Sequence, residues 1–160
     1  MKPATLAELK KELHHRSGEE ILQLCLRLAR FKKENKELLT YLLFESEDEA
    51  AFVEGVKTAV EGMFQEINVK SYHYIKKSVR KILATLKRYI RYSGKRETEV
   101  ELLLHFCQEL RDMRPSLGGN ITLKNLYQRQ LAYIEKRIPL LHEDLQHDYG
   151  QLLAGLRAQG

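Results

Sequence analysis

Hydrophobic residues recur every three or four positions through most of this chain, which is the spacing of one face of an α-helix. The clearest example is residues 70–96, where apolar and basic side chains fall on opposite faces. The apolar face consists of Ile75, Val79, Ile82, Leu83, Leu86, Tyr89 and Ile90. This pattern predicts an amphipathic helix that packs its apolar face inward and presents its basic face outward.

Four Ser or Thr residues each precede a Glu by three positions, the spacing of a capping box at the start of a helix. A fifth helix, the basic one, has Ser71 placed to cap its start and Gly94 placed to end it. The capping boxes, each with the helix it is expected to open, are Thr5 with Glu8 (about residues 6–16), Ser17 with Glu20 (from residue 18), Ser46 with Glu49 (an acidic helix to about residue 68) and Thr98 with Glu101 (from about residue 98).

Two of these helices are apolar on more than one face, which predicts that they lie inside the fold. They are the helix that follows residue 18 and the helix that follows residue 98. No Pro or Gly occurs between residues 31 and 44. The segment therefore forms either one long bent helix or two helices joined by a tight turn.

A heptad-like apolar stripe begins at Leu123 and continues to Leu156 in steps of three and four. Pro139 interrupts the stripe, but no capping residue or Gly precedes it and the stripe keeps its phase. We therefore expect residues 121–160 to form one long helix kinked at Pro139, with a hairpin of two helices as the alternative. The stripe either closes the bundle of its own chain, which we favour, or forms a homodimer interface.

The composition agrees with a helical protein. The 160 residues include only 3 Pro and 9 Gly, and no stretch alternates between apolar and polar residues as a strand does. Hydrophobic and charged contents of 43% and 31% exclude a disordered chain. We predict an all-α fold, either a multi-helix bundle or a short HEAT-like helical stack of about six helices, in a single domain over residues 1–160.

The sequence also bears on the cellular location. No apolar run approaches the ~18 residues of a membrane span, and no apolar signal core follows Met1. Cys25 and Cys107 each lie in an apolar run, which predicts reduced thiols with a structural role. We expect a cytoplasmic protein with no membrane contact.

Three segments resemble a known group of proteins in their overall pattern of residues. The segments are ELKKEL (8–13), EEILQLCLRLARFKKENKELLTYLLFE (19–45) and YIKKSVRKILATLKRYIRYSGKRETEVELLLHFC (74–107). In them the chain resembles small all-helical bacterial proteins of an uncharacterised family. The resemblance implies a bacterial, cytoplasmic origin, and it implies no function and no site.

Charge is distributed along the chain in alternating blocks within a net charge of +5. Residues 45–69 carry a net charge of −6, residues 70–96 carry +10, and residues 97–114 carry −3. In an antiparallel bundle the acidic segments would be neighbours of the basic helix and would neutralise part of its charge by ion pairing. Otherwise the basic face is free to bind an anionic partner.

The basic face is the strongest candidate for a functional surface. We predict a non-enzymatic helical binding or scaffold protein that uses this face to bind an acidic protein partner. Nucleic-acid binding through residues 70–96 is the alternative, because clustered Lys and Arg neutralise phosphates. The candidate partner-binding residues are Lys76, Lys77, Arg80, Lys81, Lys87, Arg88, Arg91 and Lys95.

The histidines support a second alternative, a metal-binding or hydrolytic helical bundle. His142 and His147 lie five positions apart, which places them about 140° apart around a helix and too far for one zinc ion. Glu12 with His15, and Asp144 with His147, have an acid–histidine spacing that carboxylate-bridged metal bundles use.

His105 is the remaining histidine of interest, because Glu101 and Glu109 flank it by one helical turn on each side. Flanking carboxylates orient the histidine of a general base. Gly118 and Gly119 could expose backbone amides to an anion, although such a pair is more often a plain turn. None of these patterns forms a complete motif, so we predict no enzyme, no catalytic residue, no metal and no cofactor.

Overall fold

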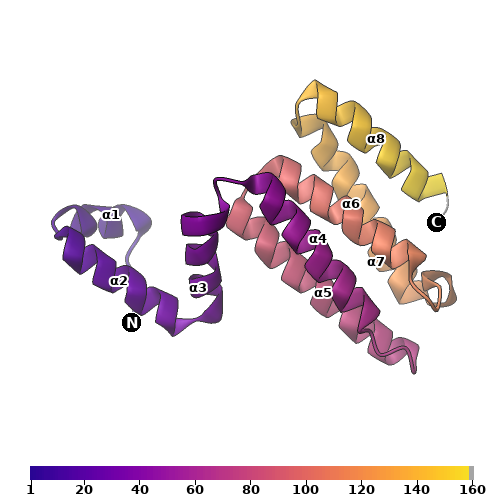
Figure 1. Ribbon diagram of the computed structural model, residues 1–160, viewed down its shortest axis with the longest axis horizontal. Coiled ribbons are helices and arrows are strands. Elements are labelled where there is room, and N and C mark those ends of the chain that lie inside the picture. Colours follow the sequence, from indigo (N-terminus) through magenta and orange to yellow (C-terminus); the bar gives the residue numbers. More distant parts are fainter. Residues whose placement is uncertain (159–160) are drawn as a thin grey trace. The chain divides into compact units, whose positions relative to one another are not determined.

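The computed structural model in Figure 1 describes residues 1–158 of the chain. These residues form eight α-helices and no strand, which confirms the all-α class. The expected count of about six helices was too low, because the segment that follows residue 18 and the C-terminal segment are each divided into two helices. Packing divides the chain into two compact units, unit 1 (Met1–Phe44) and unit 2 (from Glu45). The prediction of a single domain stays a prediction.

Unit 1 contains three short helices. The capping boxes Thr5 with Glu8 and Ser17 with Glu20 form as predicted, and they open the first two helices. At Lys32 the backbone is extended (φ −140°, ψ 145°), so the second and third helices are separate and joined by a tight turn. The helices are α1 (Leu6–His14), α2 (Gly18–Phe31) and α3 (Lys33–Thr40), and a π-helical turn (Tyr41–Glu45) follows α3.

The prediction that the helix after residue 18 lies inside the fold was wrong. No residue of α1, α2 or α3 is buried. Within unit 1, α2 packs against α3 and contacts α1 only sparsely. Two short neighbours cannot cover a helix that is apolar on more than one face.

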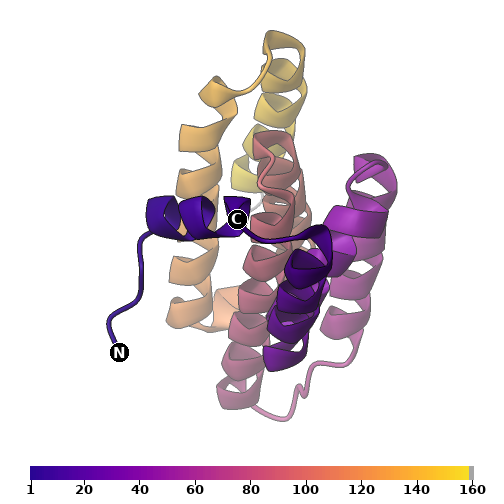
Figure 2. The ribbon, with the colours of Figure 1, turned by 90° about the vertical axis from the view of Figure 1, so that its left-hand side faces the viewer.

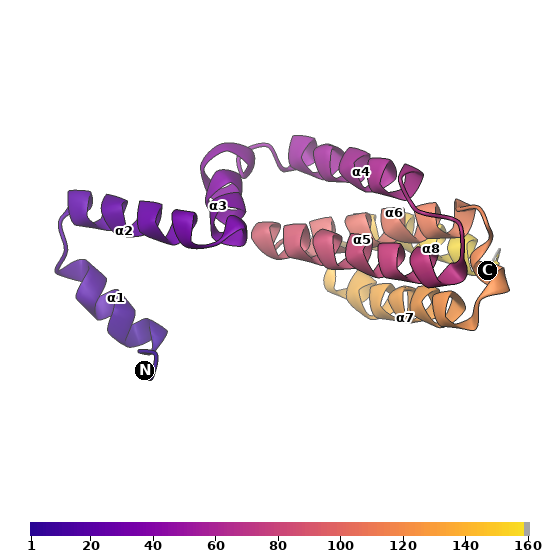
Figure 3. The ribbon, with the colours of Figure 1, turned by 90° about the horizontal axis from the view of Figure 1, so that it is seen from below.

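Unit 2 is a bundle of five helices whose axes run in roughly the same direction (Figure 2). Figure 3 shows the same bundle from below. One helix, α6, packs against each of the other four and has eight buried residues, as its apolar character predicted. The helices are α4 (Glu49–Gln65), α5 (Tyr72–Ser93), α6 (Arg96–Asp112), α7 (Ile121–Arg137) and α8 (Glu143–Ala158). No helix in residues 1–158 has both the length and the apolar character to cross a lipid bilayer.

Two of the four predicted capping boxes do not form, because tertiary contacts use their residues differently. Asp48 rather than Ser46 caps α4, and its carboxylate accepts a hydrogen bond from the Ala51 N–H. Helix α6 begins two residues before Thr98, which is therefore inside the helix and buried. Its hydroxyl donates a 2.5 Å hydrogen bond to Glu49 of α4.

The C-terminal segment is a helical hairpin rather than one long kinked helix. The 3₁₀ turn Ile138–Leu140 contains Pro139, which has no N–H to continue an α-helix. Helix α8 then returns along α7, and the Tyr127 hydroxyl donates a 2.9 Å hydrogen bond to the carbonyl of Leu156. Tyr127 and Leu131 of the apolar stripe have no exposed surface. The stripe therefore helps to close the bundle of its own chain.

Candidate binding face on helix α5

Helix α5 has the two opposite faces that the sequence predicts. Its apolar face is buried, except that Tyr89 is only partly covered. Ser71 occupies the N-cap position, without a side-chain hydrogen bond to the helix. Gly94 ends the helix as expected, with φ 67°, in the left-handed region that favours glycine.

The opposite face of α5 carries seven Lys or Arg residues, and the helix contains no acidic residue. We call the eight predicted partner-binding residues the basic face. They differ in exposure: Lys77, Arg80, Lys81, Lys87 and Arg91 are exposed, Lys76 and Arg88 are half-buried, and Lys95 is exposed in the turn before α6.

Most of the basic face is not neutralised by the acidic segments on either side of it. Lys95 forms an ion pair with Glu49 at 3.1 Å. Among residues 1–158, no ion pair forms at six members of the face, namely Lys76, Lys77, Arg80, Lys81, Lys87 and Arg91. The face therefore keeps a concentrated positive charge.

The carboxylates of α4 and α6 instead pair with other elements. Lys57 of α4 lies 2.6 Å from Glu101 of α6. Arg137 of α7 lies 2.9 Å from Glu99 of α6. Because α5 turns its apolar face toward α4 and α6, its basic residues point away from these carboxylates.

The Lys57–Glu101 pair shows that contacts within the bundle already occupy these carboxylates. Burial alone would lower the pKa of Lys57, but its hydrogen bonds to Glu101 and Glu54 outweigh burial and raise that pKa. The Tyr149 hydroxyl also donates to Glu101 at 3.2 Å. Burial, with the neighbouring Glu101 charge, raises the pKa of Tyr149 to about 12. Glu101 thus already has two partners and is not available to α5.

An open groove of about 470 Å³ lies beside the basic face, between α5, α6 and α7. Ala84 faces this groove from α5, and Lys87 and Arg91 border it. The apolar side chains that line it are Ile90, Leu103 and Tyr133, and Glu99, which is paired with Arg137, also lines it. The basic face therefore combines positive charge with an adjacent apolar recess.

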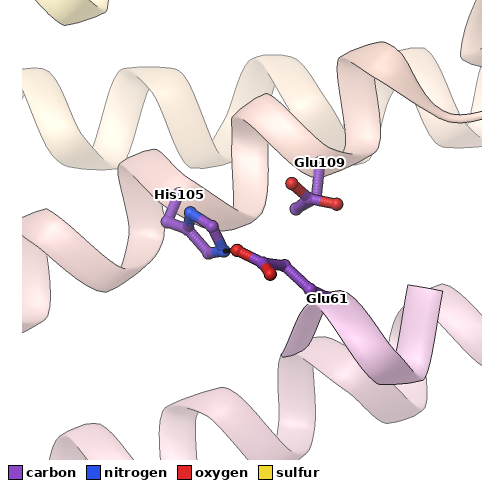
Figure 4. Close-up of side chains that lie close together, drawn as sticks. All are labelled: Glu61, His105 and Glu109. Carbon is purple, nitrogen blue, oxygen red and sulfur yellow. Dashed lines mark ion pairs between the residues drawn. The ribbon is translucent and has the colours of Figure 1, made fainter. Parts of the chain in front are cut away.

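His105 of α6 forms the second candidate site, shown in Figure 4. Its Nε2 atom lies 3.3 Å from a carboxylate oxygen of Glu61, which comes from α4. Ligand atoms of Glu61, His105 and Glu109 all lie within 4.8 Å of one another, and we call these residues the histidine cluster. Of the two carboxylates predicted to flank His105, only Glu109 belongs to it, because Glu101 pairs with Lys57.

Sequence reasoning missed Glu61. Its partnership with His105 depends on which faces of α4 and α6 meet, and spacing within one helix cannot show that. The alternation of acidic and basic blocks placed both acidic segments beside the basic helix, and it did not single out Glu61.

The other predicted histidine pairs do not form a comparable site. The histidine cluster is the one place in residues 1–158 where three potential metal ligands gather. Glu12 and His15 lie in unit 1, whereas Asp144 and His147 lie on α8 in unit 2.

The Gly118–Gly119 turn has its amides occupied. The N–H of Gly118 bonds the Ser116 hydroxyl at 3.1 Å, and the N–H of Gly119 bonds the Ser116 carbonyl at 3.2 Å. The Tyr72 hydroxyl packs so closely on Gly119 that a Cβ atom there would lie 2.1 Å from it. Glycine is needed for this close approach, so an anion site is not required to explain it.

Both cysteines are free thiols. Cys107 has no exposed surface, and burial raises its pKa to about 12 by disfavouring the thiolate. Because the thiolate is the nucleophilic form, Cys107 is structural, as its apolar setting predicted.

Comparisons with family models, with curated proteins and with solved structures give no match to this chain. The resemblance to small all-helical bacterial proteins stays a prediction.

Proposed function

We propose that this is a non-enzymatic, cytoplasmic helical binding protein that holds an acidic protein partner on the basic face. One observation carries the proposal: within the described residues 1–158, six basic side chains of this face form no ion pair, although acidic segments precede and follow α5. The bundle of unit 2 would then act as a scaffold, because it holds α5 in place through the buried apolar face of that helix.

The positively charged side chains of the basic face repel one another. Lys76 with Arg80, Lys77 with Lys81, and Lys87 with Arg91 are like-charged pairs one helical turn apart, and each costs roughly 0.2–0.5 kcal/mol in an isolated helix. A partner that supplies carboxylates along this face would remove the repulsion and add attraction, so charge complementarity favours an acidic ligand.

The groove beside the face favours a protein over a nucleic acid. An acidic segment with an aliphatic anchor can place carboxylates on Lys87 and Arg91 and its anchor against Ala84 and Tyr133, which are exposed. Single-stranded nucleic acid instead stacks its bases on several aromatic side chains, and Arg137 already lies over the ring of Tyr133 in the groove, 5.1 Å from its centroid. Tyr74 is the exposed tyrosine of α5, while the Tyr72 hydroxyl is bonded to Ser116 at 2.9 Å.

Fluorescence anisotropy with two labelled probes tests the proposal. One probe is a peptide of about 15 residues with Glu at most positions and Leu at helical spacing, and the other is oligo(dT) of similar charge. We expect the peptide to bind at least about tenfold more tightly near 150 mM salt. Tighter binding of oligo(dT), with affinity falling steeply as salt rises, would support the nucleic-acid alternative. Absence of peptide binding even at low salt would overturn the proposal.

The histidine cluster supports a second candidate function, metal binding. His105 Nε2 is buried and forms no hydrogen bond within the described part of the chain, although it lies near the Glu61 carboxylate. One imidazole and two carboxylates suit Zn²⁺ or another first-row transition metal. Three protein ligands leave a position for water, as in catalytic zinc sites, and the hydrolytic form of this alternative depends on that position.

Calorimetric titration with Zn²⁺ tests the metal candidate. We expect one ion per chain to bind the wild-type protein and the His147→Asn control, in which an exposed histidine of α8 is replaced. We expect His105→Asn to weaken binding at least about tenfold, because the variant removes the one nitrogen ligand. Wild-type protein that binds no Zn²⁺, or a His105→Asn variant that binds as well, would rule the candidate out.

A further inference from the structure

Unit 1 carries an apolar surface that its own helices leave open. Among residues 1–158, thirteen of the exposed large hydrophobic side chains lie in unit 1 and six lie in unit 2, although unit 1 is much the shorter. Exposed apolar residues that are concentrated in this way mark an interaction surface, whereas scattered ones need no explanation.

The most regular part of this surface is on α2. Ile21, Leu24, Leu28 and Phe31 follow one another in steps of three, four and three, and their exposed fractions are 37%, 43%, 60% and 77%. This is the spacing of a coiled-coil seam, which packs against a second helix. We call these four residues the α2 seam.

The seam continues toward α1. An open groove of about 560 Å³ lies between α1 and α2, and Leu9 and Leu13 line it opposite Leu24. Leu9 and Leu13 are themselves exposed. Unit 1 therefore has a ridge of apolar side chains, the α2 seam, beside an open groove. The ridge of one molecule could pack into the groove of another.

We propose that unit 1 is a dimerisation element, and that its α2 seam packs antiparallel against the α2 seam of a second copy of this chain. The distribution of charge along α2 favours the α2 helix of a second copy as the partner of the seam. The helix begins with Glu19 and Glu20, and its second half carries Arg27 and Arg30. Antiparallel pairing of two copies places each acidic end beside a basic end, and the helix dipoles are favourably opposed.

A two-fold interface requires a surface that is complementary to itself, and α2 meets this requirement in the spacing of its exposed apolar residues and in its charge. A parallel pair would bring like charges together. Residues 45–158 of unit 2 offer no matching apolar face, because their exposed large hydrophobic side chains are spread over several elements. They are Val69, Tyr74, Ile121, Tyr133, Leu140 and Leu152.

Sedimentation equilibrium of the full chain tests the proposal. At about 50 µM we expect a dimer, and we expect Leu28→Glu to weaken dimerisation at least about a hundredfold, because it buries a charge in the seam. Arg27→Glu with Arg30→Glu should weaken it at least about tenfold, since these changes place four carboxylates at each end of the interface. Circular dichroism checks that the helices persist.

Leu152→Glu is the matched control. Leu152 belongs to the C-terminal stripe, the homodimer interface that the sequence suggested as an alternative, and it is 44% exposed. We expect this variant to dimerise like wild type. A dimer that Leu152→Glu disrupts and Leu28→Glu leaves intact would contradict the proposal, as would a wild-type chain that remains monomeric.

Cys25 provides a test that needs no change in sequence. It lies near the middle of α2, so paired α2 helices bring the two Cys25 thiols close together, while Cys107 is buried and unreactive. A short bis-maleimide should link wild-type chains in pairs through Cys25. A failure to cross-link a chain that sediments as a dimer would place the interface outside α2.

Discussion

Replacing Phe106 with alanine is expected to reduce the free energy of unfolding of unit 2 by about 3–5 kcal/mol. Phe106 has no exposed surface, and its ring packs at a centroid distance of 5.6 Å from the ring of Phe64 on α4. It comes from α6, the helix that contacts all four others of the bundle. The substitution therefore leaves a cavity that the surrounding helices cannot fill without shifting several contacts at once.

Urea denaturation followed by circular dichroism measures this loss, and Ile121→Ala is the control. Ile121 is 70% exposed, so its replacement should change the free energy of unfolding by less than about 0.5 kcal/mol. A loss below about 1 kcal/mol for Phe106→Ala would contradict the central place of α6.

The amphipathic pattern predicted α5 and α6 well, because each pattern depends on residues within one helix. Residues 70–96 separate apolar from basic side chains so cleanly that only three residues differ from expectation: Tyr89 is partly exposed, and Lys76 and Arg88 are half-buried. The prediction that α2 is buried failed because burial depends on the neighbouring helices and not on residues within α2. Its apolar faces are evident in the sequence, but the sequence does not show that unit 1 supplies only α1 and α3 as neighbours.

Local signals also failed where a tertiary contact competed with them. Thr98 has the spacing of a capping residue, yet it lies inside α6, where its hydroxyl bonds Glu49. That contact joins residues 49 positions apart, and no local rule anticipates it. The unbroken phase of the apolar stripe predicts a kink at Pro139, but in a hairpin the stripe can be buried on both helices without being continuous.

The candidate sites also depend partly on residues within one helix, which the sequence shows, and partly on packing between helices, which it does not show. The residues of the basic face follow from the sequence, but whether acidic neighbours neutralise them depends on which way each helix faces. Glu101 pairs with Lys57 and Glu99 pairs with Arg137, so these acidic groups are used within the bundle. Glu61 joins His105 for the same reason, since the faces of α4 and α6 that carry them meet.

Reversing the charge of three residues on the basic face is expected to weaken binding of the acidic peptide at least about thirtyfold, or about 2 kcal/mol. The variant combines Arg80→Glu, Lys87→Glu and Arg91→Glu, all at exposed positions of α5 without an ion pair in the described chain. Because these side chains stabilise nothing by pairing, the free energy of unfolding should stay within about 0.5 kcal/mol of wild type. A large loss of stability would mean that the face is structural.

We propose that the basic face of α5, rather than the net charge of the chain, binds the acidic partner. The dissociation constant of the acidic peptide for that α5 variant, measured beside a control with the same change in charge on α7, tests this proposal. The control combines Lys124→Glu, Arg129→Glu and Lys136→Glu, which are also exposed. We predict the thirtyfold loss for the α5 variant and a change of less than about threefold for the α7 control. Equal losses in the two variants, or no loss in either, would contradict the claim.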